Sequence, residues 1–349
     1  MTNQGYTVAV VGATGAVGQQ MINLLEKMNI PVKELKLLAS SRSAGKKVPF
    51  QGEELTIEEA TPESFSGVDI ALFSAGGTVS KELAPEAVKR GAVVVDNTSA
   101  FRLDPNVPLV VPEVNEEDLK NHQGIIANPN CSTIQMVVAL EPIRKKFGLK
   151  RVIASTYQSV SGAGNSALAE MFEQTKAMLA GEEVEANILP TKSDPKHYPI
   201  AFNALPQIDQ FRDHGYTGEE LKMVHETKKI MHLPELQISV TCVRIPVERG
   251  HSESVYFEVE KADVTVSDIQ NVLTEGPGLV LMDNPAEQIY PTPQFAKGKT
   301  ETFVGRVRKD LDVDQGFHMW VVADNLLKGA AYNSLQIVQS LIKLDLLKK

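Results

Sequence analysis

The sequence predicts a two-domain α/β protein, in which a doubly wound parallel sheet is followed by an α+β domain with a mainly antiparallel sheet. The chain of 349 residues is long enough to form two hydrophobic cores. Short apolar runs alternate with amphipathic stretches up to residue 128. Beyond residue 130 the pattern changes to β-branched and alternating segments, which indicates a second kind of sheet.

The N-terminal domain is predicted from short apolar strands separated by helices. Apolar runs indicate strands at 8–11, 35–39, 70–74, 92–96 and 124–127. Amphipathic stretches indicate helices at 16–28 and 79–90. Continuous apolar strands joined by helices are typical of a parallel sheet covered on both faces, so we expect a Rossmann-type domain.

The second domain is predicted to be of the α+β class. Its expected strands lie at 151–159, 238–247, 254–259 and 319–323, and its expected helices at 167–180 and 219–231. Residues 182–206 are rich in proline, asparagine and charge, which indicates a long irregular excursion. A last helix at 326–347 has an amphipathic spacing that suits packing against the first domain. We therefore expect one domain of residues 1–128 with 326–349, and another of residues 129–325.

Composition excludes several classes of protein. An apolar fraction of 42% and a charged fraction of 23% are typical of a soluble globular protein. The net charge of −9 argues against a general affinity for nucleic acid, which needs basic patches. No apolar run is long enough to span a membrane, and the first apolar run ends in glycines, as a strand does and a signal peptide does not. Two cysteines in a chain of this length give no disulfide framework, so we expect a cytoplasmic protein. We also predict that the chain has no metal site.

A glycine-rich turn follows the first predicted strand. Gly12, Gly15 and Gly18 form a variant of the dinucleotide-binding fingerprint, at the point where a helix begins. Glycines there let the backbone approach a pyrophosphate, although a tight strand–helix turn needs glycine too. Ser74 and Gly76 end another strand, and such strand ends also line the cofactor crevice.

The end of the second predicted strand favours NADP over NAD. An NAD-preferring protein usually has Asp or Glu there to bind the ribose hydroxyls. This chain instead has Arg42 between Ser41 and Ser43, and an arginine with hydroxyl neighbours suits a 2′-phosphate. The alternative interpretation is a solvated basic turn.

Cys131 is the candidate nucleophile. It follows Asn128-Pro-Asn and begins a polar turn at the start of an apolar helical stretch. Free N–H groups and the helix dipole lower a thiol pKa at such a position. The alternative is an inert, buried cysteine. Cys242 lies in the middle of a strand and is expected to be an inert, buried cysteine of this kind, although it shares a strand face with Arg244.

Four motifs together resemble those of aspartate-semialdehyde dehydrogenases. They are, in the expected order, the segments at 128–133, 157–164, 242–251 and 325–331. The resemblance spans residues 12–331. It implies an NADP-binding domain and a catalytic and dimerisation domain, and it implies homodimers or, in some members, tetramers.

The resemblance also implies a role for individual residues. Cys131 is the expected acyl-carrying nucleophile, His251 the acid/base and Gln158 the residue that orients the substrate. Arg244 is expected to bind the α-carboxylate and Glu219 the ammonium group; Glu219 is chosen over Glu220 because it shares a helix face with Lys222. Arg102 and Lys222 are the expected phosphate ligands. The expected NADP contacts are Thr14, Gly15, Ala16, Val17, Arg42, Ser43, Ser161, Gly162 and Asn325.

The implied reaction is the NADPH-dependent reduction of L-4-aspartyl phosphate to L-aspartate 4-semialdehyde, with release of phosphate. It belongs to the biosynthesis of lysine through diaminopimelate, and of threonine and methionine. A thiolate attacks the acyl phosphate, a thioester forms, and hydride transfer gives the aldehyde. In this scheme His251 takes the thiol proton first and later protonates the collapsing intermediate.

Two other functions remain open at this stage. An N-acetyl-γ-glutamyl-phosphate reductase needs the same thiol, histidine and NADPH, but its acylated amine leaves Glu219 without a cationic partner. A non-catalytic NADP-binding sensor needs the glycine loop but not Cys131, Gln158 and His251. A glyceraldehyde-phosphate type of dehydrogenase is disfavoured because Arg42 replaces the acidic residue expected for NAD.

Overall fold

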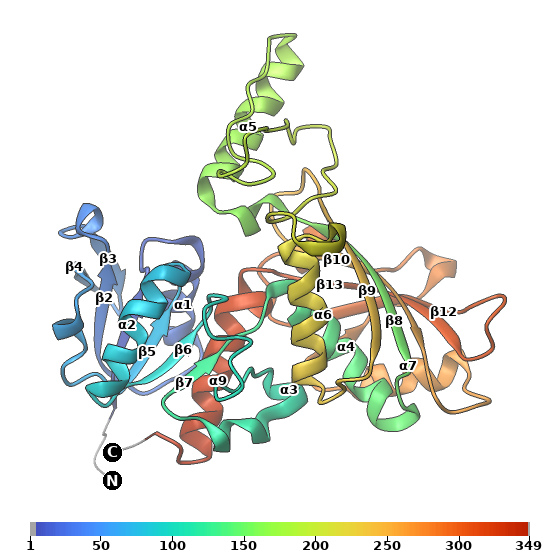
Figure 1. Ribbon diagram of the computed structural model, residues 1–349, viewed down its shortest axis with the longest axis horizontal. Coiled ribbons are helices and arrows are strands. Elements are labelled where there is room, and N and C mark those ends of the chain that lie inside the picture. The colour runs from blue at the N-terminus through green and yellow to red at the C-terminus, as the bar shows by residue number, and fades with distance from the viewer. Residues whose placement is uncertain (1–4, 348–349) are drawn as a thin grey trace. The chain divides into compact units, whose positions relative to one another are not determined.

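The structure is a computed structural model that describes residues 5–347, and it divides the chain into two compact units (Figure 1). The first unit runs up to Asn130 and resumes at Ala330; the second is Cys131–Gly329. The expected boundaries, 128/129 and 325/326, lie two and four residues before these. Each unit has its own sheet and its own core.

The sheet of the first unit has seven strands in the order β3-β4-β2-β1-β5-β6-β7. All neighbours are parallel except β3 and β4. The central strands are buried along most of their length, as their apolar runs predict. The strands are β1 (Tyr6–Val11), β2 (Val32–Ala39), β3 (Lys47–Phe50), β4 (Glu53–Glu59), β5 (Ile70–Phe73), β6 (Val93–Asp96) and β7 (Ile125–Ala127).

The sequence pattern does not predict the edge strand β3 or its neighbour β4. Each buries one side chain, Phe50 and Ile57 respectively, and the rest of each strand is exposed or half-buried. Strands of this kind have no apolar run to reveal them, and the lysine and proline of β3 protect the sheet edge.

Helices flank this sheet. The long ones are α1 (Ala16–Lys27), α2 (Gly77–Lys89) and α9 (Tyr332–Lys343), with a short α3 (Pro112–Asn115). Helix α9 packs against α1, α3 and β6, as its amphipathic spacing predicts. The expected helix at 326–347 is wrong at both ends. At its start, the carboxylate of Asp324 accepts the N–H groups of Leu326 and Leu327, and a π-helical turn, Leu327–Ala331, precedes α9. At its end, α9 stops at Lys343.

The sheet of the second unit has six strands in the order β11-β12-β13-β10-β8-β9. Three of the five pairings are antiparallel, and β11–β12 and β8–β9 are parallel, so the predicted mainly antiparallel sheet is confirmed. The sequence pattern does not predict β11 and β12. The strands are β8 (Arg151–Gln158), β9 (Gln237–Arg244), β10 (His251–Glu258), β11 (Leu279–Leu281), β12 (Thr302–Lys309) and β13 (Gly316–Ala323).

One face of this sheet is covered by helices. Helices α4 (Cys131–Phe147), α6 (Gly218–Ile230) and α7 (Val266–Glu275) pack on it. In the part of the chain that the structure describes, no helix of eight or more residues covers the opposite face, where Ile153 and Tyr157 of β8 are exposed.

Helix α5 (Asn165–Ala180) and the chain after it extend away from this sheet (Figure 1). The predicted irregular excursion folds back on α5, because Leu189 and Ile200 pack against Met171. Among residues 5–347, no helix is long and apolar enough to cross a membrane.

Candidate active site

Three predicted site residues meet at one end of the six-stranded sheet. Gln158 ends β8, Arg244 ends the parallel neighbour β9, and these two residues are paired in register. His251 begins β10, which runs antiparallel to β8 and so starts where β8 ends. All three side chains lie on the helix-covered side and are at most 5% exposed. The topology thus gathers an amide, a guanidinium and an imidazole that lie far apart in the sequence.

Helix α6 adds a carboxylate to this cluster. Oε1 of Glu219 accepts a hydrogen bond from Nε2 of Gln158 at 3.1 Å, and Oε2 is 3.2 Å from Nζ of Lys222. Glu220 points elsewhere and accepts the backbone N–H groups of Thr217 and Cys242. Glu219, not its neighbour, therefore faces the cluster.

Lys222 has a partner that the sequence pattern does not reveal. Its Nζ donates to Oδ2 of Asp209 at 2.8 Å. Asp209 has a left-handed φ of 69° and lies in the irregular segment before α6. An anion that binds Lys222 therefore competes with two carboxylates of the chain, those of Asp209 and Glu219.

Arg244 is a buried cation. Its Nη1 donates to the carbonyl oxygen of Ser159 at 2.7 Å. Burial lowers the pKa of the guanidinium, and the negative charges of Glu219, Cys131 and Cys242 oppose that shift. The favourable interaction with Cys131 links the guanidinium electrostatically to the predicted nucleophile.

His251 is neutral near physiological pH. Burial, and then the charge of Arg244, lower the pKa of the imidazole to about 3, although Glu219 and a backbone hydrogen bond with Gly250 act in the opposite direction. Its Nδ1 accepts a hydrogen bond from the backbone N–H of Ser159 at 3.0 Å.

Cys131 is the first residue of α4 and is partly exposed, as a nucleophile requires. Gln135, one turn later, donates to the carbonyl oxygen of His251 at 3.4 Å, so the start of α4 lies against the start of β10. Gly329 packs against Cys131 so closely that a Cβ added there would lie 2.8 Å from the cysteine Cβ.

Cys242 lies in the opposite kind of environment. It is fully buried, and its Sγ contacts Sδ of Met223 at 3.7 Å. Burial raises the pKa of this thiol well above its usual value, and the charge of Glu219 adds to the shift. A thiol of this kind is inert at neutral pH.

Asn325 and Ser161, two of the expected NADP contacts, form a buried network with each other. Oδ1 of Asn325 accepts from the hydroxyls of Ser159 and Ser161 and from the backbone N–H of Gly250. Gly162 leaves room beside the cluster, since a Cβ there would lie 3.1 Å from Nη1 of Arg244 and 3.4 Å from Nε2 of His251.

The other expected cofactor residues lie in the first unit, around a cavity of about 770 Å³. Gly12 has φ +91°, and a Cβ there would lie 2.9 Å from the carbonyl oxygen of Ser74. A Cβ on Gly18 would lie 2.2 Å from the carbonyl oxygen of Gly12. These close approaches fit a dinucleotide-binding turn. The cavity is lined by Gly12, Thr14, Gly15, Ser40, Ser41, Arg42 and Ser74, among others.

Some of the expected NADP contacts do not line this cavity. Ala16 and Val17 open α1, Ser43 ends a short 3-10 turn after β2, and Gly76 precedes α2 with φ +99°. Glu59, which the sequence pattern does not single out, does line it, because it ends β4 beside the end of β2.

Arg102 also lies in the first unit. It is 8% exposed, and its Nε and Nη2 donate to the carbonyl oxygens of Asn128 and Asn97. These bonds tie the guanidinium to the segment that leads into Cys131.

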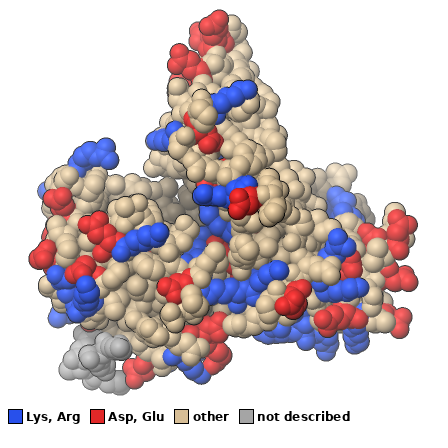
Figure 2. Space-filling view, viewed as in Figure 1, with Lys and Arg blue, Asp and Glu red and all other residues tan. Residues whose placement is uncertain are grey.

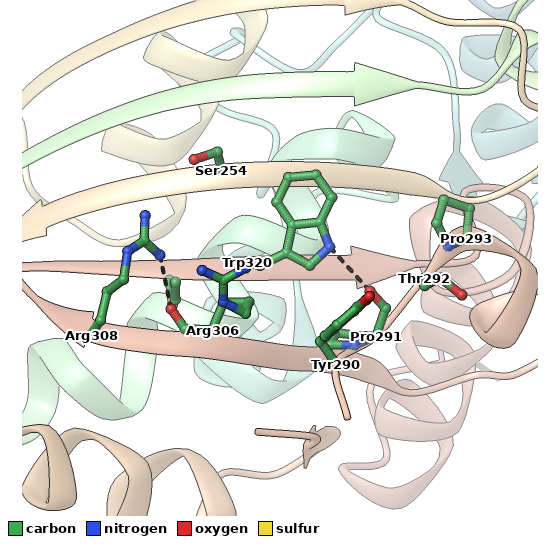
Figure 3. A pocket seen from close by; sticks show the side chains of 9 residues that line it. Ser254, Tyr290, Pro291, Thr292, Pro293, Arg306, Arg308 and Trp320 are labelled. Atoms are coloured by element: carbon green, nitrogen blue, oxygen red, sulfur yellow. Dashed lines mark hydrogen bonds between the residues drawn. The ribbon is translucent and has the colours of Figure 1, made fainter. Parts of the chain in front are cut away.

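A second cavity, of about 400 Å³, opens on the opposite face of the six-stranded sheet, where the short helix α8 (Pro293–Ala296) packs on β13 (Figure 3). Its lining includes Trp320, whose Nε1 donates to the carbonyl oxygen of Pro291, and the side chains of Arg306 and Arg308. None of the predicted site residues lines this cavity.

Charges of both signs are interspersed on the surface that Figure 2 shows, so neither sign forms a continuous area there. Within residues 5–347, no group of three or more His, Cys, Asp or Glu side chains could hold a metal ion.

Comparison with known proteins identifies the family. Two family models match, one described as "Semialdehyde dehydrogenase, NAD binding domain" over residues 7–122, the other as "Semialdehyde dehydrogenase, dimerisation domain" over residues 140–328. The chain is 66% identical to the aspartate-semialdehyde dehydrogenase of Bacillus subtilis, over 98% of this chain and 99% of that one. The chain belongs to the aspartate-semialdehyde dehydrogenase family. The family member from Aquifex aeolicus is 55% identical over 97% of this chain and 98% of its own.

Solved structures of the family share this fold. Aspartate-semialdehyde dehydrogenase II of Vibrio cholerae has a TM-score of 0.92 and 46% identity, over 97% of this chain and 99% of that one. A complex of the Vibrio enzyme with ASA is also known. A family member from Candida albicans, with NADP, has a TM-score of 0.74 and 27% identity, over 97% of this chain and 99% of that one.

Proposed function

We propose that this chain is an aspartate-semialdehyde dehydrogenase, which reduces L-4-aspartyl phosphate to L-aspartate 4-semialdehyde with NADPH and releases phosphate. The observation that carries the proposal is the burial of Glu219 and Arg244 beside Gln158, in the unit that contains Cys131. Glu219 accepts a hydrogen bond from Gln158, and Arg244 is its partner in the register of β8 and β9. A carboxylate and a guanidinium in one site suit a substrate with both an ammonium and a carboxylate group.

Covalent chemistry begins at Cys131. The start of α4 and the cation of Arg244 favour its thiolate. The sulfur attacks the acyl carbon, the carbon–oxygen bond to phosphate breaks, and the acyl group stays on the sulfur as a thioester. Bound NADPH supplies a hydride to the thioester carbonyl. The carbon–sulfur bond then breaks, which frees the aldehyde and returns the thiolate.

The remaining side chains hold the substrate in place. Arg244 binds the α-carboxylate through its planar fork, and Glu219 binds the ammonium group. Lys222 and Arg102 bind the phosphate group, which Lys222 reaches by exchanging its contacts with Asp209 and Glu219. Gln158 orients the acyl group.

NADP is the proposed cofactor. Arg42 lines the cavity beside the glycine turn, where its cation suits a 2′-phosphate. The family member from Candida albicans with NADP supports this choice. Ser161, Gly162 and Asn325 are the proposed cofactor contacts from the second unit.

The proposed assembly is a homodimer formed through the second unit, and a tetramer in which such dimers pair is the larger alternative. The match to a dimerisation domain supports the dimer. The cytoplasm is the proposed location, because the chemistry needs a reduced thiol and both cysteines are free.

The test is phosphate-dependent reduction of NADP with L-aspartate 4-semialdehyde, run beside the same assay with NAD. We expect turnover that needs phosphate and that is faster with NADP. An N-acetyl-γ-glutamyl-phosphate reductase is not favoured, because Glu219 would then face an uncharged amide. N-acetylglutamate semialdehyde is therefore the control substrate, and faster turnover of that aldehyde would contradict the proposal.

A further inference from the structure

Asp209 is a partner of Lys222 whose position the surrounding chain fixes. Its backbone has a left-handed φ of 69°, a region in which aspartate and asparagine are enriched. Its Oδ1 accepts the backbone N–H of Gln210 at 2.8 Å, and its Oδ2 accepts from Nζ of Lys222 at 2.8 Å. The backbone and the neighbouring N–H group therefore hold the carboxylate toward Lys222.

The first residue of α6 leaves room for this carboxylate. A Cβ on Gly218 would lie 2.6 Å from Oδ2 of Asp209 and 2.8 Å from its Cγ, so a larger residue would displace the carboxylate. The N–H of Gly218 also donates to the carbonyl oxygen of Gln210 at 2.8 Å, which ties the segment before the helix to its first turn. Asp209 therefore packs against the start of the helix that carries Lys222.

The two carboxylates that contact Lys222 differ in how firmly they are held. The side chain of Glu219 is 7% exposed and accepts from Gln158, whose own Oε1 accepts from the hydroxyl of Thr156 at 2.9 Å. The side chain of Asp209 is 32% exposed. Water can hydrate a carboxylate at that position when its ion pair opens, whereas Glu219 would lose buried contacts. Asp209 is therefore the partner that Lys222 releases more easily.

The charges around Lys222 oppose the binding of an anion. Its ammonium lies 2.8 Å from the carboxylate of Asp209 and 3.2 Å from that of Glu219, so two negative charges face a single positive one. In the reaction proposed above, a phosphate group approaches the same ammonium. Asp209 repels the phosphate group, and Lys222 turns toward it by giving up the contact with Asp209. Phosphate and Asp209 therefore compete for Lys222.

We propose that Asp209 is a positioning residue that lowers the affinity of the enzyme for phosphate by competing for Lys222. The inference rests on the proposed function, in which Lys222 is a phosphate ligand. In the direction of aldehyde synthesis, phosphate is free to leave once the acyl group is on the sulfur of Cys131. Asp209 recaptures Lys222 at that point, so the product leaves readily and rebinds weakly. In the reverse direction the same competition raises the phosphate concentration that the enzyme needs.

The first experiment measures phosphate binding without turnover. Asp209→Asn removes the negative charge, while asparagine suits the left-handed backbone and keeps an oxygen for the N–H of Gln210. Asp213→Asn is the matched control, because Asp213 is exposed, lies in the same segment before α6 and undergoes the same change of charge. Isothermal titration calorimetry of the intact enzymes with inorganic phosphate gives the dissociation constants.

We expect Asp209→Asn to bind phosphate about 3- to 10-fold more tightly than the wild type, because a repulsive charge and a competing ion pair are both removed. Asp213→Asn is expected to stay within about twofold of the wild type, since solvent and salt screen an exposed charge. Equal or weaker binding by Asp209→Asn would overturn the proposal, because loss of a residue that only supports the fold does not tighten binding. If neither the wild type nor the variants bound phosphate, the phosphate site and this inference would both be refuted.

The second experiment separates the effect on phosphate from a general change in the site. In the phosphate-dependent reduction of NADP, we expect Asp209→Asn to lower the KM for phosphate by about 3- to 10-fold. The KM for aspartate semialdehyde is expected to stay within about twofold, because the α-carboxylate and ammonium ligands are unchanged. A parallel change in both KM values would contradict the competition at Lys222. If phosphate binds in the expected order but the aldehyde is not turned over, the proposed function fails and the competition stands.

Discussion

The two thiols of the chain differ in exposure and in charge environment. Cys131 is partly exposed beside a cation, whereas Cys242 is buried among carboxylates and its pKa is raised. We predict that iodoacetamide modifies Cys131 much faster than Cys242 at pH 7, because only the thiolate reacts. Peptide mass spectrometry measures the order of labelling, and aspartate semialdehyde is expected to slow it.

Replacing each cysteine by alanine tests which of the two thiols takes part in catalysis. We expect Cys131→Ala to abolish turnover while NADP binding persists, and Cys242→Ala to keep turnover within about threefold. Ordinary turnover by Cys131→Ala would remove the nucleophile from the proposed mechanism.

Glu253 is a buried carboxyl group on β10, and burial raises its pKa well above 4.5. A raised pKa means that the folded protein binds this proton more tightly than the unfolded chain does. The resulting stability is fully present below about pH 4.5 and is lost as the pH rises through the folded-state pKa. Glu253→Gln removes this dependence, since the amide does not ionise.

We therefore predict that Glu253→Gln raises the melting temperature at pH 8 by about 2–4 °C, and that the gain disappears toward pH 4.5. Calorimetry of both proteins across this range measures it. A constant difference at every pH would show that Glu253 does not titrate during unfolding.

Residue spacing and sequence motifs identify part of the site at the level of single residues. The three-residue interval to Lys222 picks Glu219 over Glu220, and the structure points Glu219 into the cluster. The sequence pattern does not identify Thr156, Ser159 or Asp209 as site residues. Ser159 acts through its backbone, Thr156 is one of several threonines on strands, and Asp209 lies in an irregular segment that has no pattern.

Between elements, the π-helical turn at Leu327–Ala331 packs closely against the start of α4. A Cβ on Gly329 would lie 2.8 Å from the Cβ of Cys131, so any larger side chain must displace the first turn of α4. Single-turn π-helices occur frequently at functional sites. A glycine at position 329 is therefore needed for the turn to approach Cys131 this closely.

We predict that Gly329→Ala lowers kcat by about 100-fold while the protein stays folded, because a displacement near 1 Å at a reacting group costs that much. Gly77→Ala is the matched control, since a Cβ there has nothing within 4 Å. Steady-state kinetics and circular dichroism of both variants test this. Wild-type kcat in Gly329→Ala would mean that α4 tolerates the shift.

Element prediction succeeds where burial is two-sided. The continuous apolar runs of β1, β5 and β6 reveal them, whereas the edge strand β3 and its neighbour β4 are largely exposed, with one buried side chain each. The start of α9 is misplaced for another reason. The apolar pattern continues through the π-helical turn, and only the side chain of Asp324 ends the regular spacing.

At the scale of the whole molecule, the sequence predicts both classes of sheet but not the face that a partner covers. Strand alternation places Ile153 and Tyr157 on one side of β8, and Trp320 of β13 lies beside Tyr157 with ring centroids 5.5 Å apart. Whether helices cover that side depends on the tertiary fold. Within residues 5–347 no helix of eight or more residues covers that side, and apolar side chains there suit a partner.

The dimer is therefore expected to form through this sheet face. Ile153 is 41% exposed at the middle of β8, and a carboxylate placed there would be buried without a partner in the dimer. We predict that Ile153→Asp converts the dimer to monomers at micromolar concentration. Leu311→Asp is the matched control, because Leu311 is 99% exposed in the turn between β12 and β13 and its variant adds the same charge. Sedimentation equilibrium gives the mass of each, and a dimer of unchanged stability in Ile153→Asp would place the interface elsewhere.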